Sequence, residues 1–276
     1  MNSSSSPLVS VCIPSYNSAR HIREAIQSVL DQDYSNIELI IVDDASSDSS
    51  REVIEESILK NTYPVIYKVN LANLGLAGNW NKALSLASGK YIKVLPCDDK
   101  LHAHCISKQV DILERHDNAV LAFSSRRLID ENGREKFSIN LLREGIIRSK
   151  TLAVFSVLLG TNPVGEPGAV LFRSEVANRI GKFDDSLPYV IDVDYWLRLL
   201  EHGDGYKSSK PLSFFRISDN LSVTLGSHRY KNYQAFISKV CERYSISRFV
   251  GYIGKFQAFI NDIIRRAVHR LVFGSR

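Results

Sequence analysis

The sequence lacks the features that mark secreted and membrane-spanning proteins. Its 276 residues include four cysteines, which stand at irregular intervals without a C-x-x-C pair. No apolar run approaches the roughly 18 residues that cross a bilayer as a helix, and the polar start, MNSSSSP, lacks the apolar segment of an export signal. These absences predict a cytoplasmic protein with free thiols.

A strongly basic body is also missing. From His228 onward ten Lys and Arg stand against two acids, whereas the first 227 residues hold 25 basic and 28 acidic side chains. A protein that binds nucleic acid concentrates positive charge along its binding face, and a mildly acidic body with a basic tail does not fit that pattern. We therefore expect no nucleic-acid partner.

Several common motifs are absent as well. Neither G-x-G-x-x-G nor G-x-x-x-x-G-K-S/T occurs, which argues against a dinucleotide-binding turn and a P-loop. The G-x-S-x-G elbow of serine hydrolases is missing too. Cys97, His102, His104 and Cys105 are zinc-ligand types, but their spacing matches no standard structural zinc site.

Short apolar runs alternate with helical patterns along the chain. Runs such as LVSVCI and IELIIV indicate buried strands, and the apolar residues between them recur at helical spacing, with Asn17 or Ser18 placed to cap the first helix. The predicted strands are residues 8–13, 37–42, 65–69, 91–95, 120–124 and 169–172, and the predicted helices are residues 22–30, 46–59, 77–87 and 193–202. This alternation predicts an α/β fold with a mostly parallel sheet.

Polar residues follow three of these strands, at positions 14–17, 43–44 and 97–99. Because ligands of such folds sit beyond the carboxyl ends of the strands, these residues should converge on one edge of the sheet. Asp98 and Asp99 offer the hard oxygen ligands that Mg²⁺ and Mn²⁺ prefer, although an Asp-Asp pair also suits a solvated turn or a helix cap.

The chain resembles the family 2 glycosyltransferases of the GT-A fold in three stretches: VSVCIPSYN, IIVDDASSD and NLGLAGNWNKALSLASGKYIKVLPCDD. Two later segments, GEPGAVLFR and VIDVDYWLRLLEHGD, look like the family's acceptor-side segments, so the resemblance covers residues 8–216. It implies a Rossmann-like, mostly parallel sheet flanked by helices in a catalytic domain over residues 1–226. Residues 1–100 would form the nucleotide-sugar half and residues 101–226 the acceptor half, followed by a basic helical tail at 227–276.

The resemblance assigns the donor side residue by residue. Asp44 would accept a hydrogen bond from the imide N–H of uracil, with Asp43 in support, which favours UDP-sugars. For Asp48, helix capping is the preferred reading. The predicted contacts of the nucleotide base are Pro14, Ser15, Tyr16 and Asn17, where Tyr16 offers an aromatic face.

The resemblance also implies a divalent cation. Asp99 would hold Mg²⁺ or Mn²⁺, and Asp98 would touch the ribose. Pro96 stands where the family's common Leu-Asp-x-Asp-Asp spelling has its first acid, a departure that weakens the expected metal affinity. Ahead of the third helix, backbone N–H groups near Asn73 and Gly75 are placed to approach the donor.

The general base is assigned to Asp192, ahead of an apolar helix. A base opposite the leaving diphosphate acts by single displacement, which inverts the anomeric centre. Ile191 replaces the family's usual acid, and a helix N-cap remains the alternative role for Asp192. On the acceptor side, Asp194 would cap or orient, whereas Trp196 and Arg198 would brace the helix or face phosphate.

Two further positions belong to this expected site. Glu166, in the turn-rich NPVGEPG, would point at an acceptor hydroxyl, although Pro and Gly alone also explain a loop there. Arg216 would meet a phosphate oxygen of the donor. Ser218 stands where the family often has a histidine, and His228 is a conceivable substitute.

These assignments predict an inverting, metal-dependent glycosyltransferase. Its partners would be a nucleotide-sugar donor and a saccharide or lipid-linked saccharide acceptor in the assembly of a cell-surface polysaccharide. The alternative is a nucleotide-sugar-binding protein without transfer activity, prompted by Pro96, Ile191 and Ser218. A nucleotidyltransferase would need a glycine-rich, basic loop after the first strand, which is missing.

The tail has a helical pattern of its own. Apolar residues from Ile253 to Leu271 recur at helical spacing, and Lys255, Arg265, Arg266 and Arg270 occupy other positions. Such a basic amphipathic helix can lie on an anionic membrane surface, which would make the enzyme peripheral at the inner membrane face. Alternatively, its apolar face packs on the catalytic domain, and the two roles are compatible.

Overall fold

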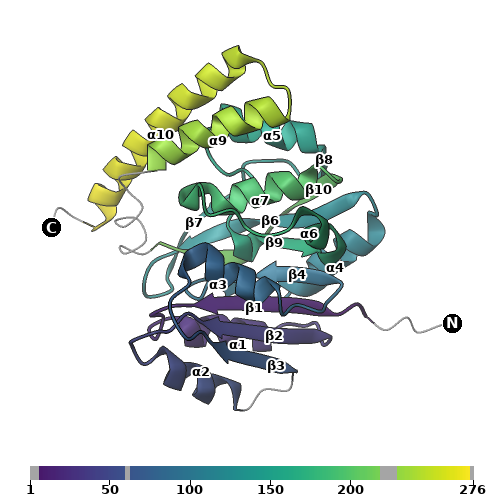
Figure 1. The fold of residues 1–276 in the computed structure, drawn as a ribbon, viewed down its shortest axis with the longest axis vertical. Helices are drawn as coiled ribbons and strands as arrows, with labels where there is room; N and C mark the ends of the chain where they lie inside the picture. Colours follow the sequence, from purple (N-terminus) through teal and green to yellow (C-terminus); the bar gives the residue numbers. More distant parts are fainter. Residues whose placement is uncertain (1–5, 60–62, 218–228, 274–276) are drawn as a thin grey trace.

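A ten-stranded mixed sheet is the framework of the molecule (Figure 1). The computed structural model describes residues 6–59, 63–217 and 229–273. The strands run in the order β3-β2-β1-β4-β9-β6-β10-β5, with β7 paired to β6 and β8 to β10. Their bounds are β1 (Val9–Ser15), β2 (Ile37–Asp43), β3 (Val65–Val69), β4 (Tyr91–Val94), β5 (Lys100–Leu101), β6 (Ala119–Ile129), β7 (Glu135–Ile139), β8 (Gly145–Ile147), β9 (Val170–Arg173) and β10 (Asp204–Arg216).

The first four long strands are parallel, as predicted, and the reversal comes at β9. Strands β3, β2, β1 and β4 pair in parallel, β9 runs antiparallel to both β4 and β6, and β6 pairs with β10 in parallel. Strand β1 continues past its predicted end through Pro14 to Ser15. Proline has no N–H for a sheet, and it is tolerated here because the pairing of β1 with β4 ends at Cys12, two residues earlier.

Helices cover both faces of the sheet. Their bounds are α1 (Ile22–Leu30), α2 (Ser50–Ile58), α3 (Gly75–Leu84), α4 (Cys105–Arg115), α5 (Ser149–Leu158), α6 (Ser174–Ile180), α7 (Ile191–Leu200), α9 (Arg229–Arg243) and α10 (Arg248–Phe273), with 3₁₀ turns η1 (Pro167–Ala169) and η2 (Pro188–Val190). Because side chains alternate across a strand, Val11 and Ile13 join the core under α1 and α4, while Cys12 joins the core under α3 and α7.

The last two helices extend the second of these cores. Phe236, Ile237 and Val240 of α9 are fully buried in it, and α10 packs on α9 and α5. One face of α10 therefore packs on the rest of the protein, which is one of the two roles predicted for the tail. No helix among the described residues is long and apolar enough to cross a membrane.

A buried lysine joins the two halves of the sheet. Lys93 of β4 has no exposed surface, and its ammonium donates to the carbonyls of Gly168 at 3.0 Å and Val170 at 2.9 Å. Buried ammonium groups are costly unless hydrogen-bonded, and these bonds offset part of that cost. They fix η1 and the start of β9 against the nucleotide half.

One local prediction was wrong. The N-cap of α1 is His21, without a side-chain capping bond, rather than Asn17 or Ser18. The chain turns earlier than the pattern indicated, because Asn17 takes a left-handed conformation (φ 45°) and the Ser18 carbonyl accepts the N–H groups of His21 and Ile22.

Candidate active site

The carboxyl ends of β1 and β2 meet at one edge of the sheet. The N–H of Asp44 donates to the carbonyl of Ser15 at 2.8 Å. The side-chain amide of Asn79, from α3, donates to the carbonyls of Ser15 and Val42 at 3.2 and 3.1 Å. The first turn predicted to face the nucleotide is thus fastened to both the second strand and α3.

The four predicted base contacts differ in exposure. Pro14 and Ser15 are buried inside β1, whereas Asn17 is exposed and Tyr16 has 51% of its surface exposed. The Asn17 carboxamide oxygen accepts the N–H of Ser47 at 2.9 Å. The ring of Tyr16 is therefore the largest surface that this turn offers to a ligand.

Asp44 organises the loop between β3 and α3. One of its oxygens accepts the amide of Asn70 at 2.7 Å and the N–H of Leu74 at 2.9 Å, and the other accepts the N–H of Gly75 at 3.0 Å. Gly75, with φ 75°, also donates to the side chain of Asn73. Its N–H therefore already has protein acceptors, and it is not free to meet a donor as predicted.

The neighbouring acids hold the turn after β2. Asp43, fully buried, accepts the N–H of Ser46 at 3.0 Å and lies 3.5 Å from the Arg51 guanidinium. Asp48 accepts the N–H of Ser50, the first residue of α2, at 3.0 Å. The N-cap position itself belongs to Ser49, so Asp48 binds the N-terminus of α2 from one residue before the cap.

The loop carrying Asp98 and Asp99 is held from the end of β10. The N–H of Arg216 donates to the Asp99 carboxylate at 2.9 Å, and its Nε donates to the carbonyl of Asp98 at 2.7 Å. The Arg216 side chain is fully buried, and its Nη2 lies 3.0 Å from Glu24. It therefore has no surface facing a phosphate, contrary to the prediction, and positions the two acids instead. Ser218 and His228 lie outside the described residues.

Two buried acids from distant parts of the chain, Asp99 and Asp192, each feel the charge of Glu166, and we call these three residues the acid cluster. A Cβ placed on Gly168 would lie 3.8 Å from an Asp99 oxygen, which shows how closely the η1 turn approaches this acid. Burial, then the charges of Asp98 and Glu166, raise the pKa of Asp99 well above its ordinary value. Burial, then the charge of Glu166, raise the pKa of Asp192 to about 7.

The position of Asp192 favours chemistry over capping. Helix α7 begins at Ile191 with Val190 as its N-cap, so the capping alternative for Asp192 is wrong. One Asp192 oxygen accepts the N–H of Val193 at 2.7 Å, and the other accepts the side-chain amide of Asn162 at 2.9 Å. A carboxyl group with a pKa near neutrality, oriented by two donors, suits a general base.

The turn that carries Glu166 is held on several sides. Arg126 forms an ion pair with Glu166 through Nε, and only 7% of the Arg126 side chain is exposed. The carbonyl of Gly165 accepts the indole N–H of Trp196 at 3.1 Å and the amide of Asn162 at 2.9 Å. Gly165 has φ 111°, which disfavours any side chain at this position. Glu166 thus points at Arg126 and the other acids from a fixed turn.

Sequence reasoning missed Arg126 and Asn162. Both act on residues that are far away in the chain, Arg126 on Glu166 and Asn162 on Asp192. A polar stretch, SSRR, in the middle of the strand AVLAFSSRRLI was the available signal for Arg126. Asn162 stood in a turn-rich segment, where an amide is unremarkable.

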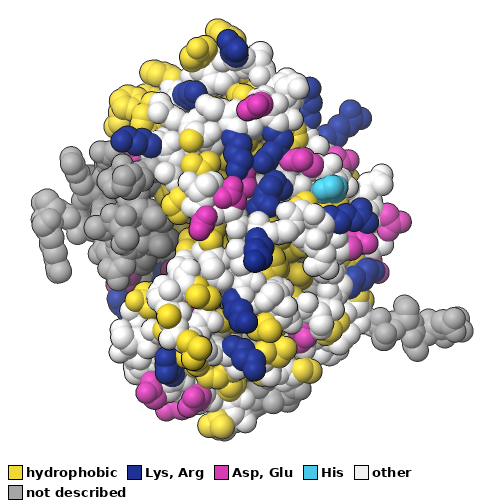
Figure 2. Space-filling view, viewed as in Figure 1, with side chains coloured by type: hydrophobic (Ala, Val, Ile, Leu, Met, Phe, Trp, Pro, Cys, Tyr) yellow, Lys and Arg dark blue, Asp and Glu magenta, His cyan; other side chains and the backbone are white. Residues whose placement is uncertain are grey.

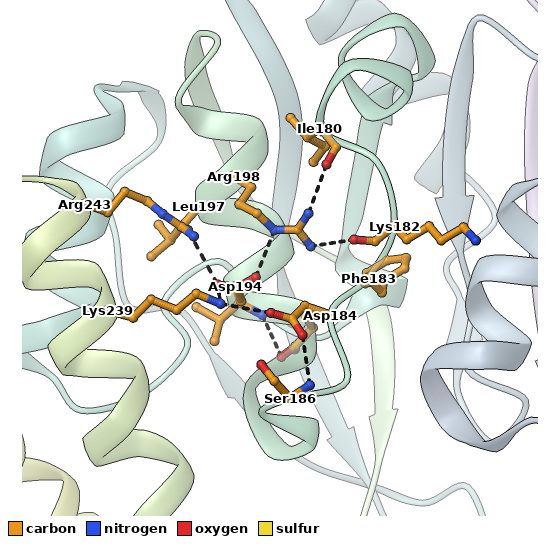
Figure 3. Close-up of polar contacts among 12 residues, drawn as sticks. Ile180, Lys182, Phe183, Asp184, Ser186, Asp194, Leu197, Arg198, Lys239 and Arg243 are labelled. Atoms are coloured by element: carbon orange, nitrogen blue, oxygen red, sulfur yellow. Dashed lines mark hydrogen bonds and ion pairs between the residues drawn. The ribbon is translucent and has the colours of Figure 1, made fainter.

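Asp194 points toward basic side chains of α7 and α9 (Figure 3). Asp194 is 3% exposed, and its carboxylate lies 2.9 Å from Arg198 and 3.5 Å from both Lys239 and Arg243 of α9. Trp196 is fully buried. The prediction that Asp194 and Trp196 contact the acceptor directly is therefore wrong. Asp194 instead orients its basic neighbours, and Trp196 and Arg198 brace helix α7.

The acids near β4 fit a divalent cation only together with a substrate. The described residues hold no group of three His, Cys, Asp or Glu side chains that could bind a metal by themselves. Mg²⁺ and Mn²⁺ often take one or two carboxylates and complete their shell with phosphate oxygens and water. Asp98 and Asp99 supply oxygens of the required kind.

A pocket lies beside this edge, between the first turn of α3 and the segment before α7. Its lining comprises Leu74, Gly75, Leu76, Ala77, Gly78, Asp185, Pro188 and Ile191. The pocket borders the loop fixed by Asp44 and the helix that carries Asp192, so a ligand there would touch both halves of the molecule.

Comparison with known proteins gives a consistent family. The model described as Glycosyl transferase family 2 matches residues 10–181. An uncharacterized glycosyltransferase of Rickettsia typhi is 29% identical over 259 residues, which cover 94% of this chain and 79% of the relative. A putative teichuronic acid biosynthesis glycosyltransferase of Bacillus subtilis is 28% identical over 232 residues, or 82% of this chain and 84% of the relative.

Solved structures share the fold. S. aureus TarS 1–349 in complex with UDP-GlcNAc aligns with TM-score 0.68 at 17% identity, over 85% of this chain and 65% of that one. The mannosyltransferase PcManGT from Pyrobaculum calidifontis, in complex with GDP-Man and Mn²⁺, aligns with TM-score 0.70 at 15% identity, over 99% and 77%. The chain spans less than two thirds of that TarS chain. These alignments confirm the predicted α/β fold.

Proposed function

The chain belongs to glycosyl transferase family 2, and we propose that it transfers a sugar from a UDP-linked donor to a saccharide hydroxyl with inversion of the anomeric centre. The observation that supports the proposal is the acid cluster, in which the charge of Glu166 acts on both Asp99 and Asp192. An enzyme of this kind needs an acid for the cation and a separate base for the acceptor, and the cluster holds both.

The hydrogen bonds of Asp44 support uracil as the base. An ionised carboxylate has about four acceptor positions, and the protein fills three of them here. One donor, such as the imide N–H of uracil, can occupy the fourth, whereas guanine presents two donors on its corresponding edge. Tyr16 and Asn17 would contact the base from the exposed turn, with Asp43 and the residues of β1 in support.

Asp99 would bind Mg²⁺ or Mn²⁺, and Asp98 would touch the ribose. When bound, the cation would neutralise charge on the departing diphosphate. Arg216 holds both acids in place through its backbone and side chain. The Mn²⁺ in the solved PcManGT complex is a property of that protein and supports this assignment by analogy.

Asp192 would remove the proton of the acceptor hydroxyl. Its ionised form is the active one, and the carboxylate accepts that proton as the hydroxyl oxygen attacks the anomeric carbon. Glu166 would lie beside the acceptor, fixed by Arg126. Attack from the side opposite the leaving diphosphate gives inversion.

The acceptor would be a lipid-linked or growing cell-surface saccharide, as the teichuronic acid relative suggests. An enzyme acting on such an acceptor with a cytoplasmic nucleotide sugar would work at the inner face of the membrane. The proposal therefore includes peripheral attachment there.

The test is release of UDP from a panel of UDP-sugars with Mn²⁺, with and without saccharide acceptors. We expect acceptor-dependent release by the wild-type chain and its loss in Asp192→Asn. Thermal stabilisation by a UDP-sugar without turnover on any acceptor would instead support a binding protein, the reading prompted by Pro96 and Ile191. Stabilisation by GDP but not UDP would contradict the role of Asp44.

A further inference from the structure

Helix α10 has an exposed face made of apolar side chains. Between residues 249 and 264 every exposed side chain is aliphatic or aromatic, with exposed fractions of 41–73%. Five of them, Phe249, Tyr252, Phe256, Phe259 and Ile263, recur at intervals of three and four residues and so form one row along the helix. In Figure 2, apolar side chains gather where α10 runs, with Lys and Arg beside them.

The opposite face of α10 is fixed to the domain. The side-chain amide of Asn261 donates to the carbonyls of Leu159 and Gly160 at 2.6 and 3.1 Å, at the end of α5. A Cβ on Gly254 would lie 2.3 Å from the carbonyl oxygen of Val157, so the two helices approach as closely as a glycine permits. The helix cannot turn its aromatic row inward without losing these contacts.

The charges around the row are basic. Residues 248–276 contain six Lys and Arg and one acid, and that acid, Asp262, is 7% exposed. Arg248 is exposed at the start of the helix, and four arginines follow Ile264 in the sequence. An apolar row with basic residues at both ends matches an anionic phospholipid surface in polarity and in charge.

A second copy of the chain fits this face less well. Residues 248–276 carry six Lys and Arg against one acid, so two copies meeting through this segment would bring charge of the same sign together. Crossing the bilayer is not an alternative for the described helices.

We propose that the exposed face of α10 docks on an anionic lipid bilayer, with its aromatic row among the upper acyl chains. The choice of the acceptor's own membrane rests on the proposed function, whereas lipid binding itself does not. Figure 1 shows α10 running toward the side of the molecule to which β1 and β2 point.

Co-sedimentation of the full chain with vesicles, without nucleotide, tests the proposal. We expect binding to phosphatidylcholine–phosphatidylglycerol vesicles, much weaker binding to pure phosphatidylcholine, and at least a tenfold loss of affinity in Phe249→Ser/Phe256→Ser. The control Leu59→Ser removes an equally exposed apolar side chain (80%) at the end of α2 and should bind as wild type. Circular dichroism confirms that each variant is folded.

Equal binding by the double variant, equal binding to neutral and anionic vesicles, or no binding by wild type would overturn the proposal. So would a concentration-dependent dimer that Phe249→Ser/Phe256→Ser abolishes, because the face would then belong to a second copy. UDP release with a soluble acceptor, measured without vesicles, should be unchanged in the double variant. Failure of that reaction in wild type would count against the proposed function and not against lipid docking.

Discussion

The acids that follow β2 and the acid cluster differ in what surrounds them. Asp43, Asp44 and Asp48 accept backbone N–H groups of their own or neighbouring turns. In the acid cluster, Asp99 and Asp192 lie near further carboxylates in a buried setting, and their pKa values are raised by burial and then by those charges. Acids of the first kind shape loops, whereas the proposed function assigns cation binding and proton transfer to acids of the second kind.

The strongest test of this difference is Asp192→Asn. The amide keeps the shape of the side chain but cannot accept a proton, so we expect kcat to fall by about 10²–10⁴-fold with little change in melting temperature. Sugar transfer and thermal unfolding are measured together. Asp117→Asn, at an exposed acid, is the matched control. Nearly full activity in Asp192→Asn would remove Asp192 from the acid cluster's chemistry.

Asp194 stands two residues away and should behave as a structural acid. Asp194→Asn leaves Arg198, Lys239 and Arg243 without their shared carboxylate, which should cost about 3 kcal/mol of unfolding free energy. For a chain of this size the melting temperature would drop by roughly 5–10 °C. Calorimetry checks the drop, and activity well below the transition should persist. An inactive but fully stable variant would reverse the roles of the two acids.

Glu166→Gln should move the pH dependence of the reaction. In wild type, activity should rise with pH through about 7, because Asp192 must be ionised and its pKa is about 7. The charge of Glu166 is one cause of the raised pKa of Asp192, so its removal should lower that pKa. The rise of activity with pH should then occur at lower pH. Profiles of kcat against pH for both forms measure the displacement. A limb that stays in place would show that Glu166 does not act on Asp192.

The smallest effect is expected from Asp48→Ala. Loss of the bond to the Ser50 N–H should cost about 1 kcal/mol, the usual value for a helix cap. Chemical denaturation gives this difference, and Asp48→Asn, which keeps an acceptor oxygen, should recover most of it. A large fall in kcat instead would place Asp48 among the reactive acids.

Apolar composition was enough to predict the first half of the sheet. Runs such as IELIIV are buried on both faces, so composition alone marks them. Strand β10 was missed because its sequence, DGYKSSKPLSFFR, mixes buried Lys207 and Ser208 with a proline and shows no clean alternation. Helix α5 was missed as well, since its pattern carries little amphipathic contrast.

Site residues were predictable where a sequence motif fixes their position. They were less predictable where contacts with distant residues decide the direction of the side chain. Asp99 and Asp192 were located from the resemblance, and the structure brings both near Glu166. Arg216 was expected to face phosphate, yet it lies buried between the Asp98 loop and Glu24. A single sequence does not show which partners a long side chain will find across 192 residues of chain.

Lys93 ties the strand that leads to Asp98 and Asp99 to the η1 turn that follows Glu166 and to the first residue of β9. One buried ammonium therefore fixes the distance between these two segments when the chain folds. Under the proposed function, this distance would set how far the acceptor hydroxyl lies from the donor.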